Sequence, residues 1–359
     1  MADSKQAPLD AEAAAKAAFA SVQNQPFPND IFTAPELRWA VIGCGVIANQ
    51  MAQSLALAGR KLTGVANRTL TKAQTFADQY GVEKVYDTVE DLYADPDIDA
   101  VYITTPHNTH ITYLRAALAA GKHVLCEKAI TLNSAELDEA RAIAAEHNVV
   151  LMDATTVLHM PLYQELRRRM DAGEFGRMNL AQLNFGSYKE YGDLTNRFYK
   201  RNLAGGAMLD IGVYALSVMR LFMASQPVEV VSLGNTCETG VDVAGGIVCR
   251  NAEQQLGVVS LTLHSKQPKR SVISFDNCYV EVNEYPRADH ATIVWTADGH
   301  REEVAAGTEA YALCYEMADL EQAVAGDDSK RELLDYASDV MELMTKLRAD
   351  WGVVYPEEE

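Results

Sequence analysis

The apolar stretch that begins at Trp39 runs into the segment Gly43-Cys44-Gly45-Val46-Ile47-Ala48, which has the pattern Gly-x-Gly-x-x-Ala. In this pattern the first glycine permits a tight turn, the second lets the backbone approach a pyrophosphate, and the small Ala48 lets a helix pack on a strand. A helix that begins near Val46 directs the free N–H groups of its first turn, those of Val46 and Ile47 included, toward phosphates. We expect a dinucleotide here. The same turn also occurs at strand-helix junctions that bind nothing, so the segments that follow must decide.

The residues after the expected second strand indicate which dinucleotide binds. Asn67, Arg68 and Thr69 stand where a site specific for NAD usually carries an acidic residue for the ribose 2′-hydroxyl. A guanidinium can stack on adenine and pair with a 2′-phosphate, assisted by Lys72. We therefore expect NADP(H) as the preferred cofactor and NAD(H) as the alternative. The competing interpretation is that Arg68 is an ordinary exposed residue at the start of a helix.

Polar residues also follow the expected fourth strand, in the segment Thr104-Thr105-Pro106-His107-Asn108-Thr109-His110. Proline fits the first turn of a helix, and the polar groups around it can line the ribose and nicotinamide end of a dinucleotide. We expect Thr104, Pro106, His107 and His110 to lie near the cofactor. Histidines in such places also cap or pack helices, so neither is assigned a catalytic role.

Glu127 and Lys128 follow the expected fifth strand. A lysine at the carboxyl end of a strand, beside a dinucleotide, is oddly placed for a residue that serves only solubility. Its ammonium could hydrogen-bond the nicotinamide ribose and lower the pKa of a neighbouring acid by favouring the charged form of that acid. We expect both residues in the cofactor site.

A carboxylate and a phenol, Asp210 and Tyr214, stand four residues apart after the pair Gly205-Gly206. Residues at this spacing share one face of a helix, so the two side chains would point the same way. The glycines allow close backbone approach at the start of that helix. The alternative is a surface aspartate and a half-buried tyrosine without a chemical role.

Alternating strands and helices must position the first four segments. Strands are predicted at 38–43, 62–66, 84–86, 100–103, 123–126 and 149–153, and helices at 46–59, 70–80, 88–94, 108–120 and 133–148. Alternation of this kind builds a doubly wound parallel sheet, a Rossmann fold, in which ligands bind at the carboxyl ends of the strands.

The pattern changes after about residue 153. Helices are predicted near 161–172 and 206–223, on either side of a strand at 178–186 and a polar loop. Strands follow at 228–236, 242–249, 256–264, 270–275, 278–283 and 291–296, and helices near 310–325 and 330–349 end the chain. Consecutive strands without helices between them predict a largely antiparallel sheet, covered by helices on one face. The fold class is therefore α/β, with a Rossmann domain followed by an α+β domain that has an open-faced sheet.

Two domains are expected because the chain has 359 residues, more than the usual single core of about 250–300. We place a dinucleotide-binding domain at 37–155 and a substrate and oligomerisation domain at 156–359, with the last helices as candidates to pack back on the Rossmann domain. Residues 1–36 form an N-terminal arm with a helix from Leu9 to Val22. The arm is either a partly ordered appendage or a grip on a neighbouring subunit.

Composition argues against several classes of partner. The formal net charge of -19 argues against nucleic acid and anionic membranes, because both bind basic faces. No apolar run approaches the roughly 18 residues of a spanning helix, and no signal-peptide region follows the N-terminus. We expect a cytoplasmic protein with a small-molecule substrate. The six cysteines lack paired spacing and are expected as reduced core residues, with no metal site and no disulfide framework.

Together these motifs resemble the Gfo/Idh/MocA family, named for glucose-fructose oxidoreductase, inositol dehydrogenase and a rhizopine catabolism protein. The resemblance runs from about Arg38 to Pro356 and includes the glycine turn, Thr105 to His110, Glu127-Lys128 and the segment from Gly205 to Tyr214. In this family the lysine of Glu-Lys-Pro and a later Asp-x-x-x-His or Asp-x-x-x-Tyr pair form the catalytic group. The resemblance thus implies catalytic roles for Lys128, Asp210 and Tyr214.

Tyrosine at 214 resembles the branch with dimeric dihydrodiol dehydrogenase, NADP-dependent xylose dehydrogenase and the glucose-fructose and aldose-aldose oxidoreductases. Two departures stand out. Ala129 replaces a proline that is typically preceded by a cis peptide, so either that bond is kept or Lys128 is presented differently. Thr156 and Leu158 stand where the branch has Trp and Arg, which leaves the substrate open. His159, nearby, is either a substrate contact or a packed structural histidine.

The leading hypothesis is an NADP(H)-dependent oxidoreductase that acts on the CH–OH group of a sugar, polyol or related alcohol or carbonyl. Tyr214, with an ordinary pKa of about 10 lowered by Lys128, would exchange a proton with the substrate oxygen, and Asp210 would bind a neighbouring hydroxyl. The alternatives are internal redox with a tightly held cofactor and a cofactor-binding sensor without turnover. The resemblance also implies a homodimer or homotetramer built on the second sheet, whose runs at 228–249 and 256–263 are too apolar for one face in water.

Overall fold

The computed structural model describes residues 9–22, 25–191 and 194–359 of the chain. Contacts divide the chain into two compact units. Unit 1 comprises 1–131, 135–154 and 310–335, and unit 2 comprises 132–134, 155–309 and 336–359. Part of the expected arm, residues 1–8 and 23–24, lies outside the described residues, and its helix α1 occupies Leu9–Val22 as predicted.

Unit 1 is built on a six-stranded sheet in the order β3-β2-β1-β4-β5-β6. Its strands are β1 (Trp39–Ile42), β2 (Gly64–Ala66), β3 (Lys84–Tyr86), β4 (Ala100–Ile103), β5 (His123–Cys126) and β6 (Leu151–Asp153). Every pairing is parallel. β1 and β4 are buried along their whole length, which explains their continuous apolar sequences. The predicted Rossmann sheet is confirmed.

Along the chain, the helices of this unit alternate with its strands, as the sequence predicts. They are α2 (Val46–Leu57), α3 (Leu70–Tyr80), α4 (Val89–Ala94), α5 (His110–Ala119) and α6 (Ser134–Glu146), which begins in unit 2. Local sequence fixes their ends. The Thr88 hydroxyl accepts the Asp91 N–H at 3.1 Å and caps α4, and Gly81 at φ +68° ends α3.

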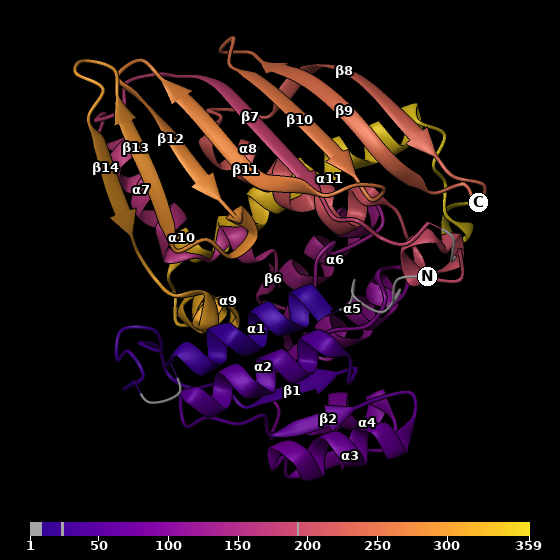
Figure 1. Cartoon of the computed structure of the whole chain (residues 1–359). Coiled ribbons are helices and arrows are strands. Elements are labelled where there is room, and N and C mark those ends of the chain that lie inside the picture. The colour runs from indigo at the N-terminus through magenta and orange to yellow at the C-terminus, as the bar shows by residue number, and fades with distance from the viewer. Residues whose placement is uncertain (1–8, 23–24, 192–193) are drawn as a thin grey trace, which may run out of the picture. The chain divides into compact units, whose positions relative to one another are not determined.

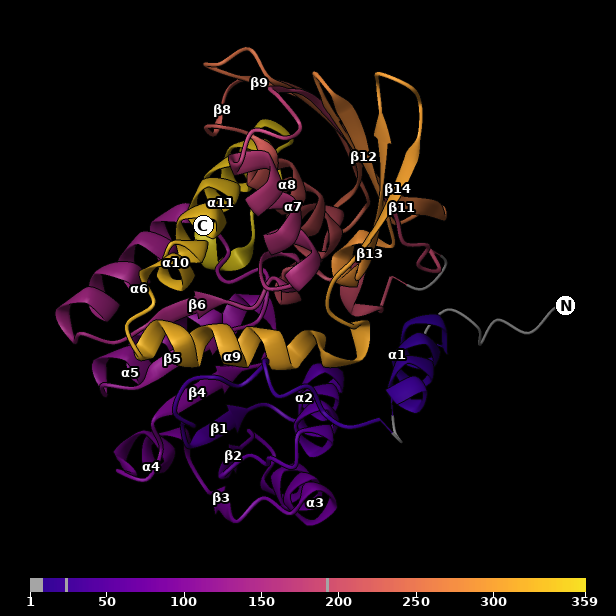
Figure 2. The same ribbon diagram turned by 90° about the vertical axis from the view of Figure 1, so that its left-hand side faces the viewer.

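A helix from far along the chain completes this unit. α9 (Ala312–Val324) and the short α10 (Asp328–Arg331) belong to unit 1. Leu313, Met317 and Leu320 of α9 join the hydrophobic core of the Rossmann sheet, and Figure 2 shows α9 running along this unit. The Glu321 carboxylate accepts hydrogen bonds from the Trp39 indole at 3.0 Å and from Arg60. A last helix thus packs on the Rossmann unit.

Unit 2 is built on an eight-stranded sheet in the order β14-β13-β12-β11-β7-β10-β9-β8, visible as the broad sheet in Figure 1. The strands are β7 (Met178–Gly186), β8 (Pro227–Thr236), β9 (Asp242–Asn251), β10 (Leu256–Thr262), β11 (Gln267–Phe275), β12 (Cys278–Asn283), β13 (His290–Trp295) and β14 (Arg301–Ala305). Only β10 and β7 pair in parallel. The largely antiparallel sheet is confirmed, and β14 is an addition because its charged sequence Arg-Glu-Glu gives little strand signal.

Helices cover one face of this sheet. They are α7 (Pro161–Asp171), α8 (Val213–Phe222) and α11 (Leu333–Asp350), which begins in unit 1. A π-helix, Met208–Gly212, leads directly into α8 where the sequence predicts one regular helix. The stretch Arg201–Phe222 is long and apolar enough to cross a membrane, contrary to the expectation for this chain, but 83% of its apolar 18-residue window is buried inside the structure.

The other face of the sheet presents apolar side chains along β8 to β10. Val231 is 76% exposed and Leu233 82% exposed. Val248 of β9 lies opposite Val231 in the strand register, so it points to the same side. The alternate residues Ile247 and Cys249 are buried. The predicted excess of apolar positions therefore lies on one exposed surface, which we call the open face (Val231, Leu233, Val248 and Leu256).

The cysteines lie mostly in the interior of the two units. All six cysteines are free thiols, and five of them are buried, as predicted. Among the described residues, no group of three or more His, Cys, Asp or Glu side chains is arranged to hold a metal ion.

Candidate active site

The glycine turn joins three strand ends in unit 1. Gly43 has φ +102°, and its N–H donates to the Ala66 carbonyl at the end of β2 at 2.9 Å. A Cβ at position 43 would lie 2.7 Å from the Thr104 Oγ1 atom at the end of β4. Thr104 in turn donates its hydroxyl to the Ile42 carbonyl at 3.0 Å. Only glycine fits at position 43, and the predicted tight turn is present.

Gly45 differs from Gly43 because the protein itself does not require glycine there. It caps α2 with φ −79°, and a Cβ added to it would meet no atom within 4 Å. No side chain caps this helix, so the N–H groups of its first turn, at the 68% exposed Val46 and at Ile47, are open to an anion. Ala48 is fully buried in the core. These residues fit a pyrophosphate laid on the start of α2.

The end of β2 carries Asn67 and Arg68, and the latter is exposed. The Asn67 amide donates to the Thr69 carbonyl at 3.0 Å, which shapes the loop, whereas Arg68 has no ion-pair partner among the described residues. Burial raises the pKa of the Cys44 thiol in the glycine turn to about 11, and the positive charge of Lys72 opposes this rise. Lys72 is therefore close enough to the turn to contribute positive charge there.

His107 and His110 lie at the end of β4, in a 3₁₀-helix (His107–Thr109) that leads into α5. Pro106 precedes this first turn, and the two imidazole rings are 5.8 Å apart. The His110 Nε2 atom lies 2.8 Å from the Thr105 carbonyl, and Nδ1 lies 3.0 Å from the Ala129 carbonyl. Burial lowers the pKa of His110, which has no exposed surface. His110 thus braces two loops.

That brace holds the segment after β5, where Glu127 and Lys128 are half-buried. The Tyr102 hydroxyl of β4 donates to the Glu127 carboxylate. The peptide bond between Lys128 and Ala129 is cis, so the conformation typical of a Lys-Pro sequence is kept although alanine replaces proline. The structure therefore gathers the ends of β1, β2, β4 and β5 at one edge of the sheet.

Asp210 and Tyr214 belong to unit 2, whereas Lys128 belongs to unit 1. Asp210 lies in the π-helix and is buried, and its carboxylate is 3.7 Å from the Arg197 Nη2 atom. Tyr214 lies in the first turn of α8, half-buried, with its ring 6.1 Å from the Phe185 ring of β7. The predicted helix thus begins with a wider π-helical turn that contains Asp210, and Tyr214 lies in the α-helix that follows.

Gly205 and Gly206 have a different explanation from the one the sequence suggests. A Cβ at 205 would lie 2.6 Å from the Phe198 carbonyl, and a Cβ at 206 would lie 2.3 Å from the Asp242 carboxylate. The approach that these glycines permit is therefore made by the protein's own backbone and side chains. His159, the other expected substrate contact, precedes α7 and is fully buried.

Sequence reasoning missed three residues around this helix: Arg197, Asp242 and Tyr355. Arg197 stands in a polar loop without a motif. Asp242 did carry a signal, because it is an acidic residue at the start of an otherwise apolar strand.

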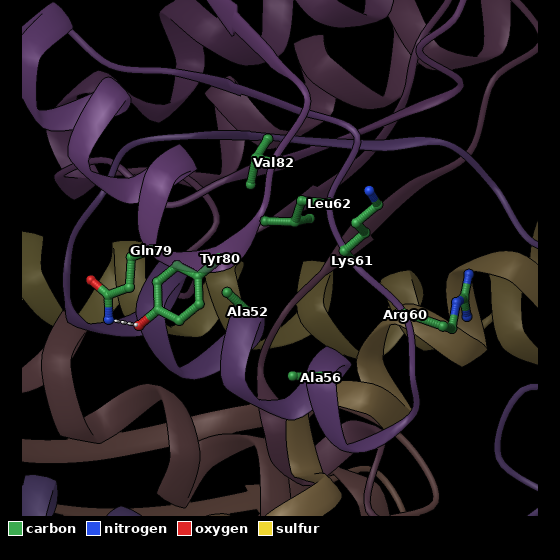
Figure 3. A pocket seen from close by; sticks show the side chains of 8 residues that line it. All are labelled: Ala52, Ala56, Arg60, Lys61, Leu62, Gln79, Tyr80 and Val82. Carbon is green, nitrogen blue, oxygen red and sulfur yellow. Dashed lines mark hydrogen bonds between the residues drawn. The ribbon is translucent and has the colours of Figure 1, made fainter.

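A pocket of about 170 Å³ lies elsewhere in unit 1 (Figure 3). It is lined by Ala52, Ala56, Arg60, Lys61, Leu62, Gln79, Tyr80 and Val82. Lys61 and Leu62 precede β2, so the pocket is at the amino end of that strand, away from the expected cofactor edge. Both cations in it are paired, Arg60 with Glu321 and Lys61 with Glu83.

Two family models match the chain. Residues 37–155 match an oxidoreductase family with an NAD-binding Rossmann fold, and residues 163–281 match the GFO/IDH/MocA C-terminal domain. Trans-1,2-dihydrobenzene-1,2-diol dehydrogenase of Mus musculus is 32% identical over 244 residues, 66% of this chain and 72% of that protein. The Xenopus laevis protein of the same name is 27% identical over 332 residues, 89% of this chain and 99% of that protein.

Solved structures agree with these relatives. A 3-ketoreductase from Actinomadura kijaniata, in complex with NADP and TDP-benzene, superposes with a TM-score of 0.74 at 25% identity, covering 88% of this chain and 98% of that one. A levoglucosan dehydrogenase, in complex with NADH and levoglucosan, superposes with a TM-score of 0.75 over 87% of this chain and 97% of that one, and at 20% identity it supports the fold alone. The chain is an NAD(P)-binding oxidoreductase that belongs to the Gfo/Idh/MocA family.

Proposed function

We propose that this oxidoreductase uses NADP(H) in preference to NAD(H) and acts on the CH–OH group, or the corresponding carbonyl, of a sugar, polyol or related diol. The observation that carries the cofactor preference is Arg68, an exposed cation at the end of β2, with no carboxylate at 67–69. A 2′-phosphate would find a bidentate partner there, and Lys72 adds a second positive charge. The solved 3-ketoreductase with NADP supports the same preference.

The substrate class rests on Asp210 and on the relatives. An ionised carboxylate accepts hydrogen bonds from two hydroxyl donors, and the Arg197 guanidinium lies 3.7 Å from the Asp210 carboxylate. Neighbouring hydroxyls on a substrate would satisfy such a group. The curated relatives are named as dehydrogenases of a diol.

Each residue of the proposed site then has a role. The backbone of the glycine turn and the start of α2 hold the pyrophosphate, and Thr104, Pro106, His107 and Glu127 line the nicotinamide end of the site. When bound, the nicotinamide supplies a hydride acceptor or donor. Tyr214 takes the proton of the substrate hydroxyl on oxidation and returns it on reduction, the Lys128 ammonium binds the nicotinamide ribose, and Asp210 holds a neighbouring hydroxyl of the substrate.

The spectrum of the purified protein, followed by a substrate panel, tests this proposal. We expect NADP⁺ to be reduced, with absorbance rising near 340 nm, when sugars, polyols or trans-diols are added. Absorbance near 340 nm before any addition, discharged by an aldose without net NADP⁺ reduction, would instead support internal redox with a held cofactor. No turnover with any member of the panel, in either direction, would contradict the proposed substrate class.

A further inference from the structure

The turn from Gly205 to Met208 begins the helix that carries Asp210 and Tyr214, and it is held from two sides within unit 2. The N–H groups of Gly205 and Gly206 donate to the carbonyls of Lys200 and Phe198, both at 2.9 Å. Gly206 has φ +125°, a conformation that only glycine adopts readily. The turn is therefore shaped by specific contacts.

Asp242 makes the first of these contacts. It is the first residue of β9, it has no exposed surface, and its Oδ2 atom accepts the Met208 N–H at 2.6 Å. The Oδ1 atom faces Gly206 and has no hydrogen-bond partner among the described residues. A buried carboxylate is costly, and the geometry gives one of its two oxygens no hydrogen bond within the described residues. Such an arrangement points to a function for the charge at the start of this helix.

Tyr355 makes the second contact. Its buried hydroxyl donates to the Gly205 carbonyl at 2.7 Å, from the segment that ends the chain. The buried Arg348 lies 4.7 Å from the Tyr355 ring and pairs with Glu358 at 2.7 Å. Glu358 also accepts the Tyr355 N–H at 3.0 Å. The position of the Tyr355 hydroxyl is thus fixed by an ion pair behind it.

We propose that Asp242 and Tyr355 are positioning residues for the reaction: they hold the two ends of the Gly205–Met208 turn and so set the place of Asp210 and Tyr214. The role rests on the proposed function, in which those two side chains bind substrate and move the proton. An acceptor at the helix start satisfies a free N–H group and favours the helix dipole. A displacement of about 1 Å at the reacting groups can cost roughly a hundredfold in rate.

The variants Asp242→Ala, Asp242→Asn and Tyr355→Phe test the proposal in the full chain. Asparagine keeps an acceptor for the Met208 N–H and loses the charge, whereas alanine loses both. Asn251→Ala is the matched control, because Asn251 is a buried polar residue at the other end of the same strand, where it accepts the Gln255 N–H at 2.9 Å.

Two readouts separate positioning from general damage. The first, hydrogen exchange of the peptide that covers 206–214, needs no substrate. We expect exchange there to rise tenfold or more in Asp242→Ala, less in Asp242→Asn and Tyr355→Phe, and not in Asn251→Ala. The second is steady-state kinetics, where kcat should fall at least tenfold in Asp242→Ala, with NADP(H) affinity unchanged and partial recovery in Asp242→Asn.

Unchanged exchange at 206–214 in both Asp242→Ala and Tyr355→Phe would overturn the proposal. An equal rise in Asn251→Ala would also overturn it, as would faster exchange with kcat unaltered. If Asp242→Ala does not fold, Asp242→Asn and Tyr355→Phe carry the same comparison. Absence of turnover in the parent protein would count against the proposed function instead, and the exchange measurement would still decide whether these two residues hold the helix.

Discussion

The Arg197 guanidinium lies 3.7 Å from the buried Asp210 carboxylate, although its own side chain is 61% exposed. The two come from separate segments, a 3₁₀-helix at Arg197–Tyr199 and the π-helix at Met208–Gly212. An exposed cation beside a buried anion can move into solvent and leave its place to a substrate hydroxyl. This relationship makes Arg197 a candidate for substrate affinity.

Replacing Arg197 with alanine is expected to raise KM for the substrate about two- to fivefold and to leave NADP(H) affinity unchanged. The effect is modest because a partly exposed pair contributes roughly 0–1 kcal/mol. Arg197→Lys should recover most of the loss. Steady-state kinetics with a cofactor titration would check this. A larger effect on kcat than on KM would show that Arg197 acts on the chemical step.

The cofactor preference is expected to depend on Arg68. Arg68→Asp should abolish most of the preference for NADP(H), because the aspartate repels a 2′-phosphate and can accept a ribose 2′-hydroxyl. Fluorescence titrations with NADPH and NADH would measure both affinities. Arg301→Asp, on the exposed start of β14 in unit 2, makes the same change in net charge and should alter neither. Equal affinities in the parent protein would disprove the proposed preference.

Both sheets could be predicted from the sequence because their patterns are local. Continuous apolar runs marked the buried parallel strands, and Gly43 and Gly45 marked the turn. β14 was missed because Arg301, Glu302 and Glu303 are charged, and strand order could not be read from periodicity. The π-helix was missed because the four-residue spacing of Asp210 and Tyr214 also fits one face of an ordinary α-helix and so does not indicate a wider turn.

Contacts between distant segments account for the rest of the site. Tyr355 and Asp242 reach Gly205 and Met208 from 150 and 34 residues away. Their role follows from packing and could not be inferred from spacing. Gly205 and Gly206 show the opposite case: their sequence suggested a functional approach to the helix start, but the atoms that lie close to them belong to the chain itself.

Stability should respond to the titration of Asp242. Burial raises the pKa of its carboxyl to about 6, from 3.8, while the N–H groups of Met208 and Ala207 and the Arg348 guanidinium oppose the rise. Tyr355 also interacts electrostatically with Asp242, and Arg348 is itself paired with Glu358. Because the folded state holds the proton more tightly, the free energy of unfolding falls as pH rises from about 4 to about 6, by up to about 3 kcal/mol.

Denaturant unfolding of the parent and of Asp242→Asn at pH 4 to 8 would measure that effect. The stability of the parent relative to the variant should decrease with rising pH and level off above about pH 7. Asn251→Ala should follow the parent at a constant offset. A relative stability that increases with pH would mean that the folded state favours the ionised carboxylate.

The open face is expected to be covered by a second copy of the chain. Val231 and Leu233 are exposed at 76% and 82%, and they lie on one surface with Val248. A contiguous apolar surface of this kind is typical of an interface. Leu233→Glu should shift light scattering toward the mass of one chain, whereas Val354→Glu, at an exposed residue outside the sheet, should not. One chain mass for the parent across micromolar concentrations would contradict the prediction.

The chemical step is expected to depend on Tyr214 and Lys128 in different ways. Tyr214→Phe removes the proton donor and acceptor but keeps the ring beside Phe185, so cofactor affinity should stay nearly unchanged while kcat falls about a hundredfold or more. Lys128→Met should impair both, because its ammonium is expected to hydrogen-bond the nicotinamide ribose, and a misplaced nicotinamide transfers hydride more slowly. Pre-steady-state hydride transfer, together with NADPH titration, separates the two effects. If Tyr214→Phe keeps turnover within a few-fold of the parent, the proton takes another path. His110 is then a poor candidate, since both its ring nitrogens lie within hydrogen-bond distance of backbone carbonyls, and His159 becomes the residue to replace next.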